Sequence, residues 1–151
     1  MDGYHGMPIR TSRDDETDDL FDIWQRSVAA THDFLTAQDL DEIAATVLDQ
    51  YLPNTEFLVI TDDSDRPYGF MGMTDANVDS LFIDPDRRGG GAGRMLMDEA
   101  KRLYPAGLTV DVNEQNAQAV GFYERIGFRV TGRTPLDGMG KPYPILHLRW
   151  P

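Results

Sequence analysis

Residues 78–103, VDSLFIDPDRRGGGAGRMLMDEAKRL, constrain the fold of this chain more than any other stretch. The β-branched or bulky apolar residues Val78, Leu81, Phe82 and Ile83 precede Asp84-Pro85-Asp86, a turn-forming sequence. This order predicts a strand that ends in a turn. Beyond Gly93, apolar residues recur at the spacing of one helix face: Leu96, Ala100 and Leu103. The stretch therefore predicts a strand, a glycine-rich turn and an amphipathic helix in direct succession.

A glycine-rich turn at the start of a helix is suited to binding phosphate. The first backbone N–H groups of a helix lack partners, and the helix dipole places partial positive charge there. Glycines allow positive φ and a close approach of the backbone to an anion. Arg88 and Arg94 flank these glycines and can add charge-assisted hydrogen bonds. A plain flexible turn is the alternative, but the position between a strand and a helix favours phosphate binding.

Two familiar phosphate motifs do not fit this turn. A Walker A loop requires lysine and then serine or threonine, whereas Gly93 is followed by Arg94 and Met95; a dinucleotide fingerprint requires glycine where Leu96 stands. The remaining pattern, RGGGAG at residues 88–93, resembles the R/Q-x-x-G-x-G/A signature of the GNAT superfamily, the acyl-CoA-dependent N-acyltransferases. In that family the turn holds the pyrophosphate of CoA.

A second stretch, NEQNAQAVGFYERIGF at residues 113–128, resembles another segment of the same family, N-x-x-A-x-x-[FL]-Y-E-x-x-G-F. The matching residues are Asn116, Ala119, Phe122, Tyr123, Glu124, Gly127 and Phe128. The resemblance runs over about residues 8–150. Within the superfamily the chain resembles the bacterial YjaB-type acetyltransferases, in segments 30–35, 82–86, 113–116 and 140–144.

The resemblance implies an α/β (α+β) GNAT fold, with a mixed, mostly antiparallel central sheet of about seven strands flanked by about four helices. The chain fits this order, β-α-α-β-β-β-α-β-α-β-β. Strands are predicted over 8–11, 56–61, 68–74, 78–83, 108–112, 128–131 and 145–150. Helices are predicted after Asp14, after a capping box at Thr36, after Gly93 and after Asn116. We expect residues 132–142 to form a loop, residues 1–7 a disordered tail, and residues 8–151 one domain.

Composition excludes several classes of protein. The net charge of −12 disfavours a nucleic-acid partner and suits a cationic acceptor, although solubility alone could explain it. No apolar run is long enough to span a membrane and the first residues do not resemble a signal peptide, so we expect a cytoplasmic protein without a membrane partner. The absence of cysteine excludes disulfides and a covalent cysteine intermediate.

The chemistry implied by the resemblance is direct transfer of the acetyl group of acetyl-CoA, the co-substrate, to a primary amine. The family places the backbone N–H groups that stabilise the oxyanion on the strand Leu81-Phe82-Ile83. Tyr123 matches the family's general acid for the leaving thiolate, with a core tyrosine as the alternative. Asn116 matches an asparagine that binds pantetheine, and it also fits a helix N-cap. The implied CoA-binding residues are Leu81, Phe82, Ile83, Arg88, Gly89, Gly90, Gly91, Ala92, Gly93, Arg94 and Asn116.

The base and the acceptor pocket are less defined. An aliphatic ammonium has a pKa near about 10, so a base or a proton path is required. Asp111 and Asp79 are the expected bases, acting through water; Glu114 is a third option.

His32 follows the first helix and could orient the acceptor, with a hydrogen-bonded loop histidine as the alternative. Phe34 and Tyr143 are expected pocket walls. His5, His32 and His147 do not form a defensible metal cluster, so no metal is expected.

The sequence leaves three functions open for this chain. The leading one is acetyl transfer to a small amine. The first alternative is acetylation of protein N-termini or lysines, and the second is a regulatory module that binds acyl-CoA without turnover. A homodimer is compatible with the family. The acceptor itself is not encoded in either motif.

Overall fold

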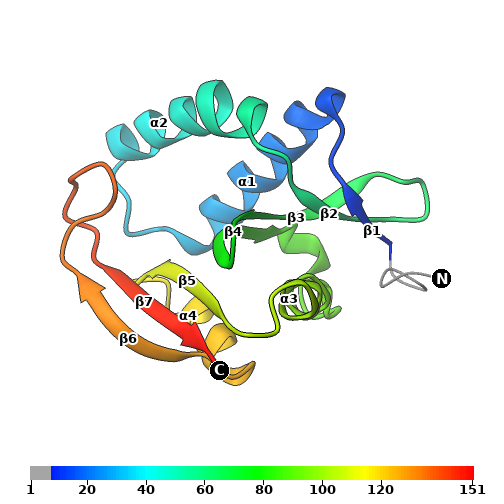
Figure 1. The fold of residues 1–151 in the computed structure, drawn as a ribbon. Helices are drawn as coiled ribbons and strands as arrows, with labels where there is room; N and C mark the ends of the chain where they lie inside the picture. The colour runs from blue at the N-terminus through cyan, green and yellow to red at the C-terminus, as the bar shows by residue number, and fades with distance from the viewer. Residues whose placement is uncertain (1–7) are drawn as a thin grey trace. The chain divides into compact units, whose positions relative to one another are not determined.

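The computed structural model describes residues 8–151; residues 1–7, the expected tail, lie outside the described part. The main elements (Figure 1) are β1 Ile9–Thr11, α1 Thr17–Thr31, α2 Ala37–Thr46, β2 Leu58–Thr61, β3 Pro67–Thr74, β4 Asn77–Ile83, α3 Ala92–Leu103, β5 Leu108–Asn113, α4 Ala117–Arg125, β6 Arg129–Thr134 and β7 Ile145–Trp150. Shorter helical turns are η1 Asp14–Glu16, η2 Val47–Tyr51, η3 Leu52–Asn54 and η4 Pro85–Arg87.

The strands form one seven-stranded sheet in the order β1-β2-β3-β4-β5-β7-β6. The pairs β1–β2, β2–β3, β5–β7 and β6–β7 are antiparallel, and β4–β5 is parallel. The β4–β5 register pairs Asn77 with Thr109 and Val78 with Val110. The predicted mixed, mostly antiparallel sheet with four helices is therefore confirmed.

The chain divides into two compact units. Unit 1 comprises the residues up to 72 and residues 80–99, and unit 2 comprises residues 73–79 and 100–151. Strands β3 and β4 contribute to both, because the division falls after Gly72 on β3 and before Ser80 on β4. Each unit has its own buried apolar residues.

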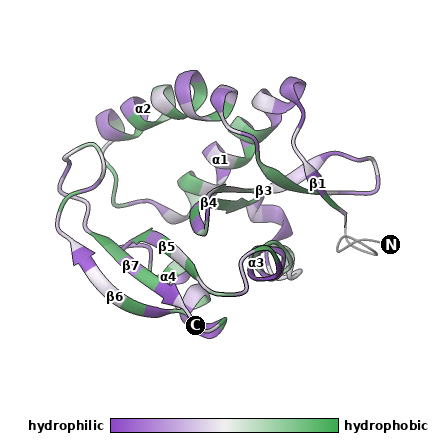
Figure 2. Ribbon diagram, viewed as in Figure 1, coloured by the Kyte–Doolittle hydropathy of each residue, from purple (hydrophilic) through white to green (hydrophobic). Residues whose placement is uncertain are grey.

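The core of unit 1 is built by the inward faces of α1, β2 and β3. Leu20, Ile23, Trp24 and Val28 recur at helical spacing on α1 and are at most 5% exposed. They pack in one cluster with Val59 of β2 and Phe70 of β3. In Figure 2, hydrophobic and hydrophilic segments alternate along α1, as expected of an amphipathic helix. Burying each large apolar side chain contributes roughly 1.5–3 kcal/mol to the free energy of folding.

Unit 2 places α4 on one face of its strands (Figure 1). On β5 the alternate residues Leu108, Val110 and Val112 are buried, and Leu148 on β7 is paired with Val110. Gly127, just after α4, has φ +104, and a Cβ there would lie 3.1 Å from the Trp150 ring. Since Trp150 lies on the same face of β7 as Leu148, α4 covers this apolar face. Figure 2 shows the alternation along β7.

The predicted loop at residues 132–142 needs a correction. Residues 132–134 belong to β6, not to the predicted loop, because they pair with β7 beyond an irregularity between Val130 and Gly132. Glycine is rare in strands, and here it marks the bulge. The second predicted helix begins at its Thr36 cap, whose hydroxyl accepts from the Asp39 N–H at 3.1 Å, and after Thr46 it continues as the π-helical turn Val47–Tyr51. Within residues 8–151 we find no helix long and apolar enough to cross a bilayer.

Candidate active site

The glycine-rich turn lies in unit 1, between β4 and α3. Gly89 and Gly91 have φ of +80 and +83, and a Cβ on either would meet nothing within 4 Å. Glycine is therefore required by the backbone conformation, while the space beside it is open. Met95 donates its N–H to the Gly91 carbonyl at 2.9 Å, so the N–H groups before Met95 have no acceptor one turn back in the helix. This arrangement is suited to an anionic ligand such as a phosphate group.

Three arginines surround the turn, and they differ in their surroundings. The Arg87 guanidinium lies 4.3 Å from the centre of the Tyr68 ring and 4.0 Å from Asp62. Arg88 and Arg94 are exposed. Within residues 8–151 no carboxylate pairs with Arg94, which leaves its charge available to a phosphorylated ligand.

An ion pair fastens the start of the turn to α1. Arg26 donates to both carboxylate oxygens of Asp84, at 2.7 and 2.8 Å. The same carboxylate accepts from the Asp86 N–H at 3.0 Å, and the Asp84 N–H donates to the Tyr68 carbonyl at 2.8 Å. Hydrogen bonds from Arg26 hold the pKa of the Asp84 carboxyl below its ordinary value. The backbone entering the turn is thus held by side-chain and main-chain bonds.

The strand expected to carry the oxyanion donors, Leu81-Phe82-Ile83, is the last part of β4. Phe82 packs against the unit 1 core, its ring centre 5.6 Å from that of Phe70. Gly69 is tightly enclosed beside this strand, because a Cβ there would lie 2.6 Å from Ile83 Cδ1. Packing therefore fixes this strand, which leads directly into the turn.

Tyr123 and Asn116 lie on α4 in unit 2. Tyr123 is 6% exposed, and its ring centre lies 5.2 Å from that of Phe122 and 5.5 Å from that of Phe128. Burial raises the pKa of the Tyr123 phenol above its ordinary value. The phenol is therefore protonated at neutral pH, as a general acid requires. Asn116 is the N-cap of α4, and its side-chain oxygen accepts from the Ala119 N–H at 3.2 Å.

Each of the expected bases is hydrogen-bonded within unit 2. Asp79 accepts from the Thr74 hydroxyl at 2.5 Å and from the Asn77 amide at 2.6 Å. Asp111 lies 2.6 Å from Nδ1 of His147. The third option, Glu114, pairs with Arg133, whose hydrogen bonds lower the pKa of the Glu114 carboxyl.

Sequence reasoning assigned no role to His147 or to Thr134, although the structure joins both to Asp111. Nε2 of His147 lies 2.6 Å from the Thr134 hydroxyl. Asp111 and His147 are directly opposed in the β5–β7 register. The alternation of β7 places His147 on the polar face, but only the register shows which residue it meets.

The residues expected to bind the acceptor lie in different units. His32 and Phe34 lie together after α1 in unit 1, their ring centres 5.2 Å apart. His32 Nδ1 lies 2.7 Å from the Thr31 hydroxyl, and burial lowers the pKa of the His32 imidazole. Tyr143, in unit 2, is buried. Among residues 8–151, no group of three or more His, Asp or Glu side chains could hold a metal ion.

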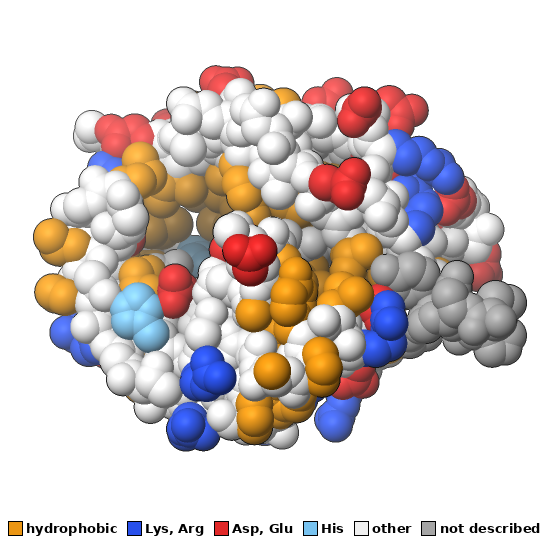
Figure 3. All heavy atoms as spheres, in the orientation of Figure 1, with side chains coloured by type: hydrophobic (Ala, Val, Ile, Leu, Met, Phe, Trp, Pro, Cys, Tyr) orange, Lys and Arg blue, Asp and Glu red, His pale blue; other side chains and the backbone are white. Residues whose placement is uncertain are grey.

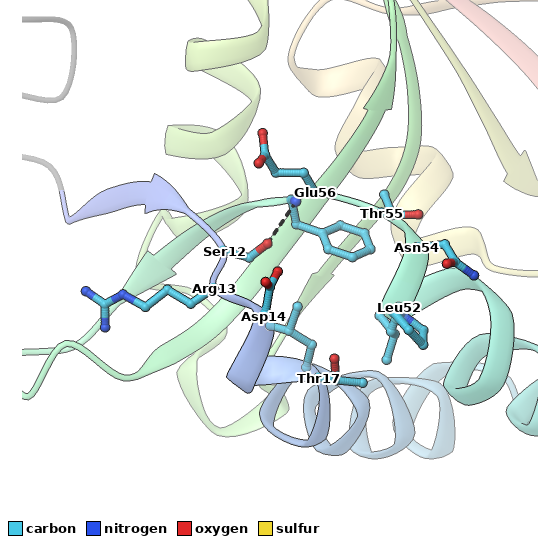
Figure 4. A pocket seen from close by; sticks show the side chains of 11 residues that line it. Ser12, Arg13, Asp14, Thr17, Leu52, Asn54, Thr55 and Glu56 are labelled. Carbon is cyan, nitrogen blue, oxygen red and sulfur yellow. Dashed lines mark hydrogen bonds between the residues drawn. The ribbon is translucent and has the colours of Figure 1, made fainter.

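Unit 1 also contains a hollow of about 300 Å³ that none of the expected site residues line. Figure 4 shows Asp14, Thr17, Thr55 and Glu56 around it, and Arg13 extending away. The Ser12 hydroxyl accepts from the Phe57 N–H at 3.0 Å in its wall. Its polar rim surrounds a buried apolar floor.

Known proteins place the chain in a family. Residues 25–137 match the acetyltransferase (GNAT) domain. The chain is 52% identical over 143 residues to the peptidyl-lysine N-acetyltransferase YjaB of Salmonella typhimurium, covering 95% of this chain and 97% of that protein. It is 49% identical over 144 residues to YjaB of Escherichia coli, with the same coverage.

The solved structures agree. The solution structure of apo YjaB from Escherichia coli superposes with a TM-score of 0.89, covering 94% of this chain and 95% of that one. An N-acetyltransferase from Thermoplasma acidophilum, solved in complex with coenzyme A, has the same fold at 18% identity and a TM-score of 0.73, covering 93% of this chain and 98% of that one. The chain belongs to the GNAT family of acetyltransferases, and it is an acyl-CoA-dependent N-acetyltransferase.

Proposed function

We propose that this enzyme transfers the acetyl group of acetyl-CoA to lysine side chains of proteins. The observation that carries the proposal is the identity of 52% and 49%, over nearly the whole chain, to two proteins named peptidyl-lysine N-acetyltransferases. These names support the protein-acceptor alternative and do not support the expected preference for a small amine. The net charge of −12 is complementary to lysine-rich surfaces, and Figure 3 shows acidic side chains over α2.

Acetyl-CoA supplies an activated thioester, and residues of the chain supply binding and proton transfer. The N–H groups at the start of α3, with Arg88 and Arg94, bind the diphosphate; Asn116 binds the pantetheine arm. Backbone N–H groups of residues 81–83 stabilise the negative oxygen of the tetrahedral intermediate. The phenol of Tyr123, protonated because it is buried, gives its proton to the leaving thiolate. A lysine ammonium, with a pKa near about 10.4, loses its proton before attack.

Competing acceptors in one reaction provide the test. Purified enzyme and acetyl-CoA are mixed with lysine-containing peptides, the same peptides with lysine replaced by arginine, and a panel of small amines. We expect CoA release and a mass increase of one acetyl group on the lysine peptides only. Acetylated small amines beside unmodified peptides would contradict the proposal. Acetylation of the arginine peptides at their N-termini would assign the enzyme to α-amines instead. Binding of acetyl-CoA without any acetylation would indicate a regulatory module.

A further inference from the structure

A linear array of three polar side chains crosses the exposed face of unit 2. Asp111 on β5 lies 2.6 Å from Nδ1 of His147 on β7, and Nε2 of the same ring lies 2.6 Å from the hydroxyl of Thr134 on β6. We propose that His147, held by Asp111, is the base that removes the proton of the acceptor ammonium, with Thr134 as the link to the acceptor. This inference rests on the proposed function.

The hydrogen bonds determine the role of each ring nitrogen. An ionised carboxylate only accepts hydrogen bonds, so the bond to Asp111 requires the proton of a neutral imidazole on Nδ1. Nε2 then carries the lone pair and accepts from the Thr134 hydroxyl. Asp111 also stabilises the imidazolium that forms when Nε2 takes a proton. His147 is thus prepared to act as a base at Nε2.

An imidazole suits this task better than the aspartate alone. A free carboxylate has a pKa near about 3.9 and a free imidazole near about 6.5, against about 10.4 for a lysine ammonium. Of these two free groups, the imidazole is the stronger base. The Asp111 carboxylate serves His147, so it is a positioning residue in this arrangement.

Other charged groups lie on the strands around the imidazole. On β4, Asp79 follows Val78, which is paired with Val110, so strand alternation places Asp79 on the same face as Asp111. Arg149 follows two residues later on β7, on the same face by strand alternation. Arg133 on β6 is paired with Glu114 at 2.8 Å, so its charge is compensated. The side chains of His147 and Asp111 are 38% and 52% exposed. A proton taken up by His147 can therefore pass on to water.

The acid and the base fall on opposite faces of the same three strands. Val110 and Leu148 are paired and face α4, which carries Tyr123. Asp111 and His147 are the neighbouring pair, so their side chains point to the other face. Tyr123 would therefore protonate the thiolate from one face of these strands, and His147 would take up the proton of the amine on the other face. Because the strands separate them, Tyr123 would not transfer its proton directly to His147.

The proton transfer balances without any further reactant. The acceptor ammonium donates a hydrogen bond to the Thr134 oxygen. One N–H bond of the ammonium breaks as an O–H bond forms, while the original Thr134 proton moves to Nε2. The products are a neutral amine, an unchanged threonine and an imidazolium beside Asp111, which then loses its proton to water. The neutral amine attacks the thioester carbon.

Three variants test the array: His147→Gln, Asp111→Asn and Thr134→Val. The matched control is Thr131→Val, because the Thr131 hydroxyl, on the same strand, donates to the His147 main-chain carbonyl and not to the ring. With a lysine peptide we expect kcat/KM of His147→Gln to fall about 100-fold at pH 7.5, a usual size for a lost general base. The acid limb of its pH profile should also disappear. Thr131→Val should match wild type in both.

The pH dependence of the lysine reaction separates catalysis from structure. A lysine ammonium has a pKa near about 10.4, so near pH 10 much of the amine is already neutral and needs no base. The His147→Gln defect should therefore diminish toward pH 10. A variant that keeps the wild-type rate and pH profile would overturn the inference, as would a defect of the same size at pH 7.5 and pH 10. Absence of lysine acetylation by wild type would instead refute the proposed function, and the inference with it.

Discussion

The glycine turn of unit 1 (residues 88–93) and the polar face of unit 2 (Asp111, His147 and Thr134) differ in the chemical groups that form them. The turn consists of main chain, with glycines at φ +80 and +83 beside open space. The polar face consists of side chains fastened to one another, such as Asp111 and His147 at 2.6 Å. A main-chain site tolerates few residue types at each position, so it leaves a contiguous motif. A side-chain site draws on three strands and leaves almost no local trace.

The strongest test of the main-chain site is Gly91→Glu. Glutamate would force a left-handed conformation on a side-chain-bearing residue and bring a negative charge to an anion site. We expect acetyl-CoA affinity to fall by at least about 100-fold, or roughly 3 kcal/mol. Calorimetric titration gives the affinity. Gly138→Glu is the control, because Gly138 lies in open space without positive φ and should bind normally. Unchanged binding by Gly91→Glu would show that the turn does not hold the diphosphate.

Tyr123→Phe tests whether the Tyr123 phenol contributes to the rate of the reaction without contributing to acetyl-CoA binding. Removing the phenol should lower kcat about 100-fold and change the KM for acetyl-CoA less than about threefold. Steady-state kinetics at pH 7.5 measure both. Tyr104→Phe, in the same unit, should retain full activity. If Tyr123→Phe keeps its kcat but unfolds at a lower temperature, the tyrosine serves the core and not the reaction.

Asp84→Asn tests how far side chains support the turn. Asparagine preserves the cap but removes the charge that meets Arg26, and we expect a loss of about 1.5 kcal/mol in unfolding free energy. The pKa of Asp84 is lowered in the fold, so its contribution is present at neutral pH and is lost as pH falls below about 3.9 toward the folded value. Urea unfolding at pH 7 and pH 3 should show the difference shrinking. Asp86→Asn, 89% exposed, should cost less.

Substitutions of Asn116 should have the smallest effects. They distinguish its role as the N-cap of α4 from a contact with the pantetheine arm. Asn116→Ala removes the cap of α4 and should cost about 1 kcal/mol of stability. Asn116→Ser restores a capping oxygen, so it should recover that stability. Weaker acetyl-CoA binding by the serine variant would identify the pantetheine contact. Full binding by both variants would restrict Asn116 to its structural role.

The sequence was most informative where a feature is local. The turn at Gly89–Gly93, the caps at Thr36 and Asn116, and the alternation of β7 depend on neighbouring residues, and the structure confirms each element. The pairing of Asp111 with His147 depends on register between strands distant in the chain. The sequence predicts a loop at Thr134, because residues 132–142 contain glycines, prolines and charged residues. The acceptor class is not encoded in either family motif.

The two strands at the borders of the sheet differ in a way that affects solubility. β1 has three residues, too few to offer a long row of unpaired main-chain groups. β6 has six, but the irregularity at Val130 and Gly132 interrupts its ladder, and Arg129 and Arg133 place charge along it. Bulges and charges discourage edge-to-edge association of sheets. The same bulge that hid the end of β6 from sequence reasoning therefore protects this border against the aggregation that straight, uncharged edge strands promote.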